Sequence, residues 1–187
     1  MRADAERSTA RILEAAEAVL ADDPNASLER IGDAAGVARA TVHRRFTSRQ
    51  ALLDALREQL NERYLLVIEQ ASVRTAPPVL ALHRVSEIVF ELKMSHRFTI
   101  TLASAPSREV QDGLDLLFTR LHAVGAITAA GPAWCRRVYL ALMTEVFLLP
   151  DDAPELAEAG GRAGLLVKTV LGALGGHREQ PQGRGTT

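Results

Sequence analysis

Apolar residues recur along most of the chain at the three- and four-residue spacing of an amphipathic helix, and in the first sixty residues this spacing predicts four helices. The apolar side of the first helix consists of Ile12, Ala15, Ala16, Val19 and Leu20. Ser27 is a favourable N-cap for a short second helix, which Gly36 ends. A third short helix would bury Val42 and Phe46. Two short helices joined by a tight glycine turn form a helix-turn-helix.

A long fourth helix is expected from about residue 48, where Thr47 and Gln50 match a capping box. Prolines at 77 and 78 break the pattern. Beyond them, helices are expected over 79–96, 107–124, 134–149 and 155–174, with a short helix over 97–105 because no second strand exists to pair with that segment. The fold class is therefore all-α: a three-helix module with a helix-turn-helix, followed by a second helical domain.

The last two of these helices are apolar around much more than a third of their circumference. Such helices must be covered on more than one side. A second copy of the chain could cover them in a four-helix contact across a two-fold axis. The expected interface residues are Val138, Leu142, Val146, Leu166, Val170 and Leu174. Gly160, Gly161 and Gly164 would allow close approach there, although a deeply buried helix in a monomer remains the alternative.

Composition places the chain among cytoplasmic globular proteins. Its longest stretch without a charged residue has fifteen residues, and a membrane span needs about 20. The first residues contain no apolar segment of a secretory signal. The single Cys135 cannot form an intramolecular disulfide, so a reducing cytosol is the expected compartment. The polar, glycine-rich residues 176–187 are expected to be a disordered tail.

Charge distribution is more informative than the net charge of −1. The segment 34–53 holds four arginines and no acid, whereas acidic residues lie on both sides of it. A surface that faces phosphates needs such a basic island. On charge alone a solvated helix face is an equally good interpretation.

The residues from Ser27 to Leu53 resemble the DNA-binding module of the TetR family of bacterial repressors. The resemblance lies in an Ala-Gly-Val turn at 35–37, a Thr-Val-His-Arg-Arg-Phe helix at 41–46 and a Ser-Arg-Gln-Ala-Leu-Leu helix start at 48–53. The remaining two-thirds of the chain is similar to the family only in its helical layout.

The resemblance implies that the second helix of the pair lies in the major groove of DNA, with its first residues at base edges. Arg39 would then bind guanine, Ala40 a thymine methyl group, and Thr41 a phosphate or a base. His43 stands where the family usually has a phosphate-binding tyrosine. The other expected contacts are Arg44 to DNA, Arg45 and Arg49 to the DNA backbone, and Ser27 through the start of the second helix.

Three residues depart from the family pattern. Ala38 replaces a serine that often caps the recognition helix, which forgoes about 1 kcal/mol of capping. Gly32 stands where alanine is commoner, at a cost of up to about 1 kcal/mol in helix propensity. His43 in place of tyrosine puts the strength of that phosphate contact in doubt. None of the three removes the groove-facing side chains.

The resemblance also implies a cavity for a small molecule in the second domain. The bound molecule would change the spacing between the two DNA-binding domains of a dimer. Its expected lining residues are His83, Glu87, Phe90, Met94, Phe98, Phe118, His122 and Trp134. Each of them is also a normal core or surface residue. The chemistry of the ligand does not follow from the sequence.

An enzyme is not expected. The five histidines and Cys135 show no metal-ligand spacing, and no phosphate-binding glycine loop is present, so neither a metal nor a cofactor is predicted. The expected organisation is a DNA-binding domain over 1–50, a ligand-binding and dimerisation domain over 51–175, and the tail over 176–187. The expected function is a ligand-responsive, homodimeric repressor that reads a palindromic operator. The alternative is a helical module whose basic island binds an acidic protein.

Overall fold

The computed structural model describes residues 2–92 and 106–175 of the 187-residue chain, and within these ranges the structure is helical with no strand. The chain divides into two compact units. Unit 1 consists of residues 1–70 and 88–110, and unit 2 of residues 71–87 and 111–187. The all-α prediction is confirmed, whereas the short helix expected over 97–105 and the tail over 176–187 lie outside the described residues.

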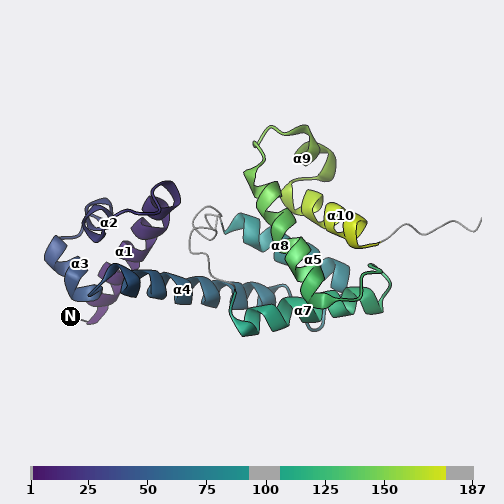
Figure 1. Ribbon diagram of the computed structural model, residues 1–187, viewed down its shortest axis with the longest axis horizontal. Coiled ribbons are helices and arrows are strands. Elements are labelled where there is room, and N and C mark those ends of the chain that lie inside the picture. The colour runs from purple at the N-terminus through teal and green to yellow at the C-terminus, as the bar shows by residue number, and fades with distance from the viewer. Residues whose placement is uncertain (1, 93–105, 176–187) are drawn as a thin grey trace, which may run out of the picture. The chain divides into compact units, whose positions relative to one another are not determined.

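Unit 1 contains four helices in its first seventy residues: α1 (Arg2–Asp22), α2 (Leu28–Ala35), α3 (Arg39–Arg45) and α4 (Arg49–Gln70). The first helix contacts each of the other three, and α2 contacts α3 (Figure 1). The whole of α4 belongs to unit 1, and the domain boundary expected at residue 50 stays a prediction. The start of α4 also differs in detail, because Ser48 and not Thr47 caps it: the Ser48 hydroxyl accepts from the N–H of Ala51 at 3.1 Å.

Unit 2 is built from the larger parts of α5 (Pro78–Glu91) and α7 (Arg108–Ala123) together with α8 (Pro132–Leu148), α9 (Pro154–Ala159) and α10 (Arg162–Gly175). Tyr139 of α8 is buried within unit 2. The Tyr139 hydroxyl lies 3.2 Å from the hydroxyl of buried Ser86 on α5, and its ring lies 5.9 Å from the ring of Phe118 on α7. These contacts join α5, α7 and α8 around one side chain.

The single helix expected over 155–174 is two helices. Gly160 and Gly161 have φ values of 74° and 104°, a region that L-residues avoid, and the Gly161 N–H donates to the Leu156 carbonyl at 2.7 Å. The turn ends α9 and lets α10 begin at Arg162. A Cβ on Gly164 would lie 2.0 Å from the carbonyl oxygen of Ala159, so this glycine serves the corner within the chain. The three glycines therefore have an intramolecular explanation.

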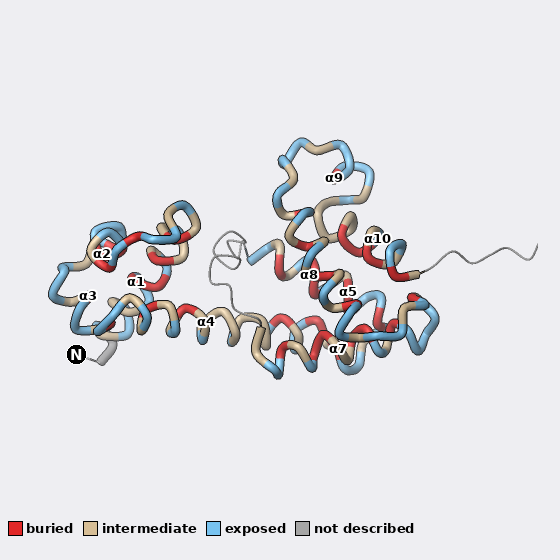
Figure 2. Tube along the Cα trace, in the orientation of Figure 1, coloured by how far each residue is buried: buried red, intermediate tan, exposed pale blue. Residues whose placement is uncertain are grey.

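The residues expected at a dimer interface divide into two groups. Val146, Leu166, Val170 and Leu174 are each at most 6 % exposed within the single chain. Their burial needs no second copy, because α8 and α10 pack on each other. Along both helices buried residues alternate with more exposed ones (Figure 2). Val138 and Leu142 are half-buried. The large apolar residues exposed on α8 are Trp134 and Leu148, neither of which was expected at an interface.

No helix in the described ranges combines the length and the hydropathy that a membrane crossing requires.

Candidate DNA-binding surface

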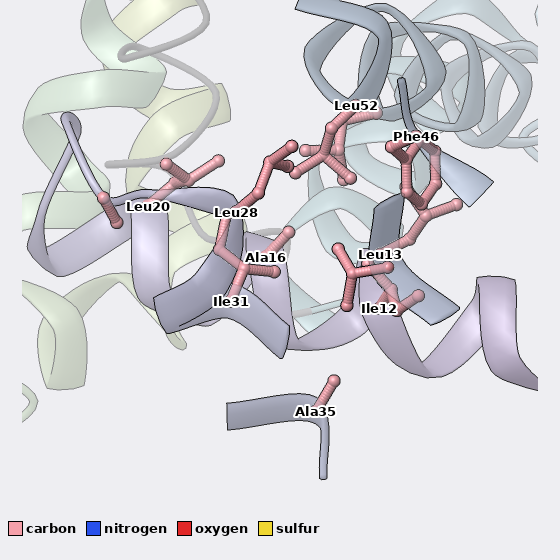
Figure 3. Packing of buried hydrophobic residues seen from close by; sticks show 12 residues of the cluster. Ile12, Leu13, Ala16, Leu20, Leu28, Ile31, Ala35, Phe46 and Leu52 are labelled. Carbon is pink, nitrogen blue, oxygen red and sulfur yellow. The ribbon is translucent and has the colours of Figure 1, made fainter. Parts of the chain in front are cut away.

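The hydrophobic core of unit 1 fixes the position of α3. Figure 3 shows Ile12, Leu13 and Ala16 from the first helix together with residues of α2, and with Phe46 and Leu52 that flank α3. Val42 is fully buried and Phe46 is 5 % exposed, as the sequence predicted. Because α3 is only seven residues long, it depends on these anchors and not on its own propensity.

The turn between α2 and α3 is held by backbone geometry and by one arginine. Gly36 has a φ of 61°, and the following N–H of Val37 donates to the Gly32 carbonyl at 3.0 Å, which closes α2. The guanidinium of Arg11 donates to the carbonyl of Ala35 at 2.7 Å and to that of Gly36 at 3.3 Å. A cation at the C-terminal end of a helix is favourable. Sequence reasoning missed this role of Arg11, since the partners lie 24 and 25 residues away.

Gly32 allows α2 and α3 to approach closely. A Cβ at this position would lie 2.7 Å from Cγ2 of Val42, a distance at which one of the two helices must shift. The departure from the family pattern is therefore compensated by packing against the recognition helix.

Most of the expected DNA contacts of α3 are accessible. Arg39, Ala40, His43 and Arg44 are exposed, and Thr41 is half-buried. Ala38 provides no side-chain cap, as predicted. Ser27 is exposed and caps α2, its hydroxyl oxygen accepting from the Arg30 N–H at 3.2 Å. These side chains form the surface that could meet the edges of bases and the phosphates beside them.

A carboxylate lies at this basic surface. Oε1 of Glu29, in the first turn of α2, lies 3.0 Å from Nη2 of Arg39 and 3.3 Å from Nε2 of His43. Hydrogen bonds from its own backbone N–H and from the Ser27 hydroxyl, followed by those from His43 and the charge of Arg39, lower the pKa of Glu29. The sequence does not reveal this pairing, because it depends on how α2 packs on α3.

Of the two arginines expected to contact the DNA backbone, Arg49 has partners within unit 1, and Arg45 lies at a groove. Arg49 donates to the carbonyls of Pro24 and Ala26, so it ties the start of α4 to the turn between α1 and α2. Arg45 lines a groove between α1 and α4 of about 600 Å³, together with Glu58 and Glu62. Their assignment to phosphates remains a prediction.

The residues expected to line a ligand cavity occupy different environments. His83 and Glu87 form an ion pair on α5 at 3.3 Å, Phe118 is buried against Tyr139, and Phe90 is half-buried. His122 and Trp134 are exposed. Met94 and Phe98 lie outside the described residues.

Chemistry other than binding has little support in the described parts of the chain. No group of three histidine, cysteine or acidic residues there could hold a metal ion. Burial raises the pKa of the Cys135 thiol, which lies 3.6 Å from the Ala129 carbonyl oxygen. The basic neighbours Arg136 and Arg137 therefore do not make it a reactive thiolate.

Comparison with known proteins agrees with this geometry. Residues 12–56 match the family of bacterial regulatory proteins described as the tetR family. An 87-residue segment, 46 % of the chain, is 44 % identical to the HTH-type transcriptional repressor LfrR of Mycolicibacterium smegmatis. That alignment spans only 46 % of the relative's own length.

Solved structures extend the likeness over the chain. The TetR-like regulator LfrR from Mycobacterium smegmatis, in complex with proflavine, is 31 % identical with a TM-score of 0.63. The match covers 91 % of this chain and 98 % of that one. The complex of SmeT with triclosan, at 22 % identity, a TM-score of 0.58 and coverage of 89 % and 91 %, shows a shared fold. The matched proteins are regulators, in agreement with the prediction that this chain is not an enzyme.

Proposed function

This chain belongs to the TetR family of bacterial regulatory proteins, and from that premise we propose that it is a DNA-binding transcriptional repressor whose DNA affinity responds to a small molecule. The observation that carries the proposal is the exposed basic face of α3, formed by Arg39, His43 and Arg44 on a helix anchored by a buried core. A helix of this kind fits the major groove, where the base edges carry a distinct pattern of donors and acceptors.

Direct base contacts come from the start of α3. Arg39 donates to O6 and N7 of a guanine, and Ala40 contacts a thymine methyl group next to it. His43, Arg44 and Ser27 bind phosphates, which fixes the register of the helix without reading sequence. Replacing Arg39 with alanine then costs about 1–3 kcal/mol of discrimination at one base pair.

The repressor acts as a homodimer. On a helical wheel Trp134, Val138 and Leu148 of α8 fall within about 80° of one another, which makes a stripe that a second copy can cover. Trp134 is 61 % and Leu148 is 55 % exposed. The exposed Glu145 lies on the same stripe, so a second copy that covers the stripe must leave this carboxylate in water or pair it with a cation. Two recognition helices related by a two-fold axis read a palindrome whose half-sites lie about one helical turn or more apart.

Size-exclusion chromatography with light scattering tests the dimer. Leu148→Glu places a charge on the exposed stripe without disturbing the core, and it converts the dimer to a monomer. Leu80→Glu is the matched control, because Leu80 is an exposed apolar residue on α5 at 43 % exposure. A Leu148→Glu variant that remains dimeric contradicts this interface.

The effector is an aromatic compound of the kind that LfrR binds in its complex with proflavine. The site lies in the helical part after residue 75, with His83, Glu87, Phe90, Met94, Phe98, Phe118, His122 and Trp134 as candidate contacts. The effector weakens DNA binding only as far as it binds the free state of the protein more tightly than the DNA-competent state. A regulator of bacterial genes that meets its operator on the chromosome acts in the cytoplasm.

Selection of DNA fragments bound by the purified protein tests the proposal. Genomic or randomised duplexes should yield a palindromic sequence, and proflavine should displace the protein from it in a fluorescence anisotropy titration. The alternative function, a helical module that binds an acidic protein, predicts that no sequence is enriched.

A further inference from the structure

One carboxylate engages three side chains that the proposed function assigns to DNA, those of Arg39, His43 and Ser27. Oε1 of Glu29 lies 3.0 Å from Nη2 of Arg39 and 3.3 Å from Nε2 of His43. The same carboxylate accepts from the Ser27 hydroxyl and from its own backbone N–H at the start of α2. A negative charge is therefore held in the middle of a surface otherwise suited to phosphates.

We propose that Glu29 is a specificity-determining positioning residue, which holds Arg39 in its base-reading orientation and keeps Arg39 from binding phosphates of non-operator DNA. The inference rests on the proposed function, and it assigns Glu29 a role that neither the sequence pattern nor the family match provides. Glu29 itself does not need to contact a base.

Operator and non-operator complexes differ in what they require of the Arg39–Glu29 pair. A guanidinium has five N–H donors. One N–H directed at Glu29 leaves the others for a guanine, so operator binding keeps the pair intact. On non-operator DNA the guanidinium gains only a phosphate, whose negative charge is repelled by the Glu29 carboxylate as long as Arg39 stays paired with it. The pair therefore opposes non-specific binding and not operator binding.

Exposure makes this competition possible. The side chains of Arg39 and His43 are 73 % and 44 % exposed, so both can rotate towards a phosphate if Glu29 releases them. Glu29 is 38 % exposed, which leaves it accessible to the same counterions and DNA charges. A carboxylate that fixes an arginine lowers the entropy lost when that arginine binds its base.

Neutralising Glu29 should therefore change two affinities in opposite directions. In Glu29→Gln, the freed Arg39 adds about one phosphate contact on non-operator DNA, which steepens the salt slope by about 0.9. If the variant and the wild type bind non-operator DNA equally at 1 M salt, this change in slope makes the variant bind it about eightfold more tightly at 0.1 M salt. Operator binding is unchanged or weaker, because Arg39 has lost its preset orientation.

The experiment measures fluorescence anisotropy on two duplexes: the sequence that the wild-type protein selects and a scrambled duplex of equal length and composition. Glu29→Gln removes the charge and Glu29→Asp keeps the charge on a shorter side chain. Asp33→Asn is the matched control, since Asp33 is an exposed acid one turn further along α2. Thermal unfolding of each variant checks that it is folded.

The inference predicts that selectivity falls about eightfold in Glu29→Gln and by a smaller factor in Glu29→Asp, and that it stays unchanged in Asp33→Asn. In an Arg39→Ala background, Glu29→Gln should have no further effect on selectivity. If Glu29→Gln shifts both duplexes by one common factor, or if Glu29→Asp behaves as wild type, the positioning role is wrong. A wild-type protein that selects no sequence would instead contradict the proposed function itself.

Discussion

The substitution Arg49→Ala tests whether Arg49 stabilises the fold or binds DNA. The sequence predicts that Arg49 binds a phosphate at the start of α4. In the structure its guanidinium donates to the carbonyls of Pro24 and Ala26, in the turn before α2. The substitution would remove both hydrogen bonds and release that turn from α4.

The magnitude follows from the number and kind of these bonds. Hydrogen bonds that involve a charged group contribute about 1.5–3 kcal/mol each, and the half-buried site lets water replace part of that. We expect the free energy of unfolding to fall by about 1–2 kcal/mol. For a chain of 187 residues, each kcal/mol lowers the melting temperature by about 2–4 °C.

Thermal unfolding followed by far-UV circular dichroism measures this change, and salt-dependent DNA titration measures the other role. Arg44→Ala is the control, because Arg44 is an exposed arginine on α3 that forms no ion pair with any described residue. It should melt as wild type does and lose about one unit of salt slope. If Arg49→Ala instead melts as wild type and loses the salt slope, the structural assignment of Arg49 is incorrect.

Two further substitutions and one labelling experiment test the packing within each of the two units. Gly32→Ala should destabilise by about 1 kcal/mol despite its better helix propensity, because the new Cβ meets Val42; a stabilised variant would show that the helices do not approach closely. Cys135 should react with a thiol reagent slowly in the folded protein and fully in denaturant, since burial raises its pKa; fast labelling of the native protein would argue against the buried position. Tyr139→Phe should lower the free energy of unfolding by about 0.5–1.5 kcal/mol, because it removes the hydrogen bond to Ser86. Urea unfolding measures this change, and an unchanged midpoint would show that the bond does not stabilise the fold.

The helices and the core of unit 1 could be predicted because they depend on local spacing. Val42 and Phe46, four residues apart, indicated the buried side of α3, and Ser27 indicated the start of α2. Such features need only the period of the helix and a capping side chain.

The partners of the charged residues could not be predicted, because they lie far apart in the sequence. Arg49 bonds carbonyls 23 and 25 residues away, and His43 meets Glu29 across 14 residues. A run of basic residues shows where positive charge lies but not which groups of the protein engage it.

What covers the apolar sides of α8 and α10 could not be predicted either, and their expected part in a dimer interface stays a prediction. An apolar circumference indicates that a helix is covered, but not whether its own chain or a second copy covers it. Val170 and Leu166 are buried inside one chain, and the split at Gly160 lets α9 fold back near α10. The local pattern also predicted one continuous helix there, because the regular apolar spacing was given more weight than the loss of about 1 kcal/mol of helix propensity at each glycine.

The central claim is that α3 reads DNA sequence through Arg39. The most direct test is anisotropy titration of wild type and Arg39→Ala against the selected operator and its single-base variants. The account predicts that wild type binds the operator best, and that Arg39→Ala loses about 1–3 kcal/mol of preference at one base pair in each half-site and none elsewhere. Equal weakening of Arg39→Ala on every duplex, or a wild-type protein without preference, would contradict it.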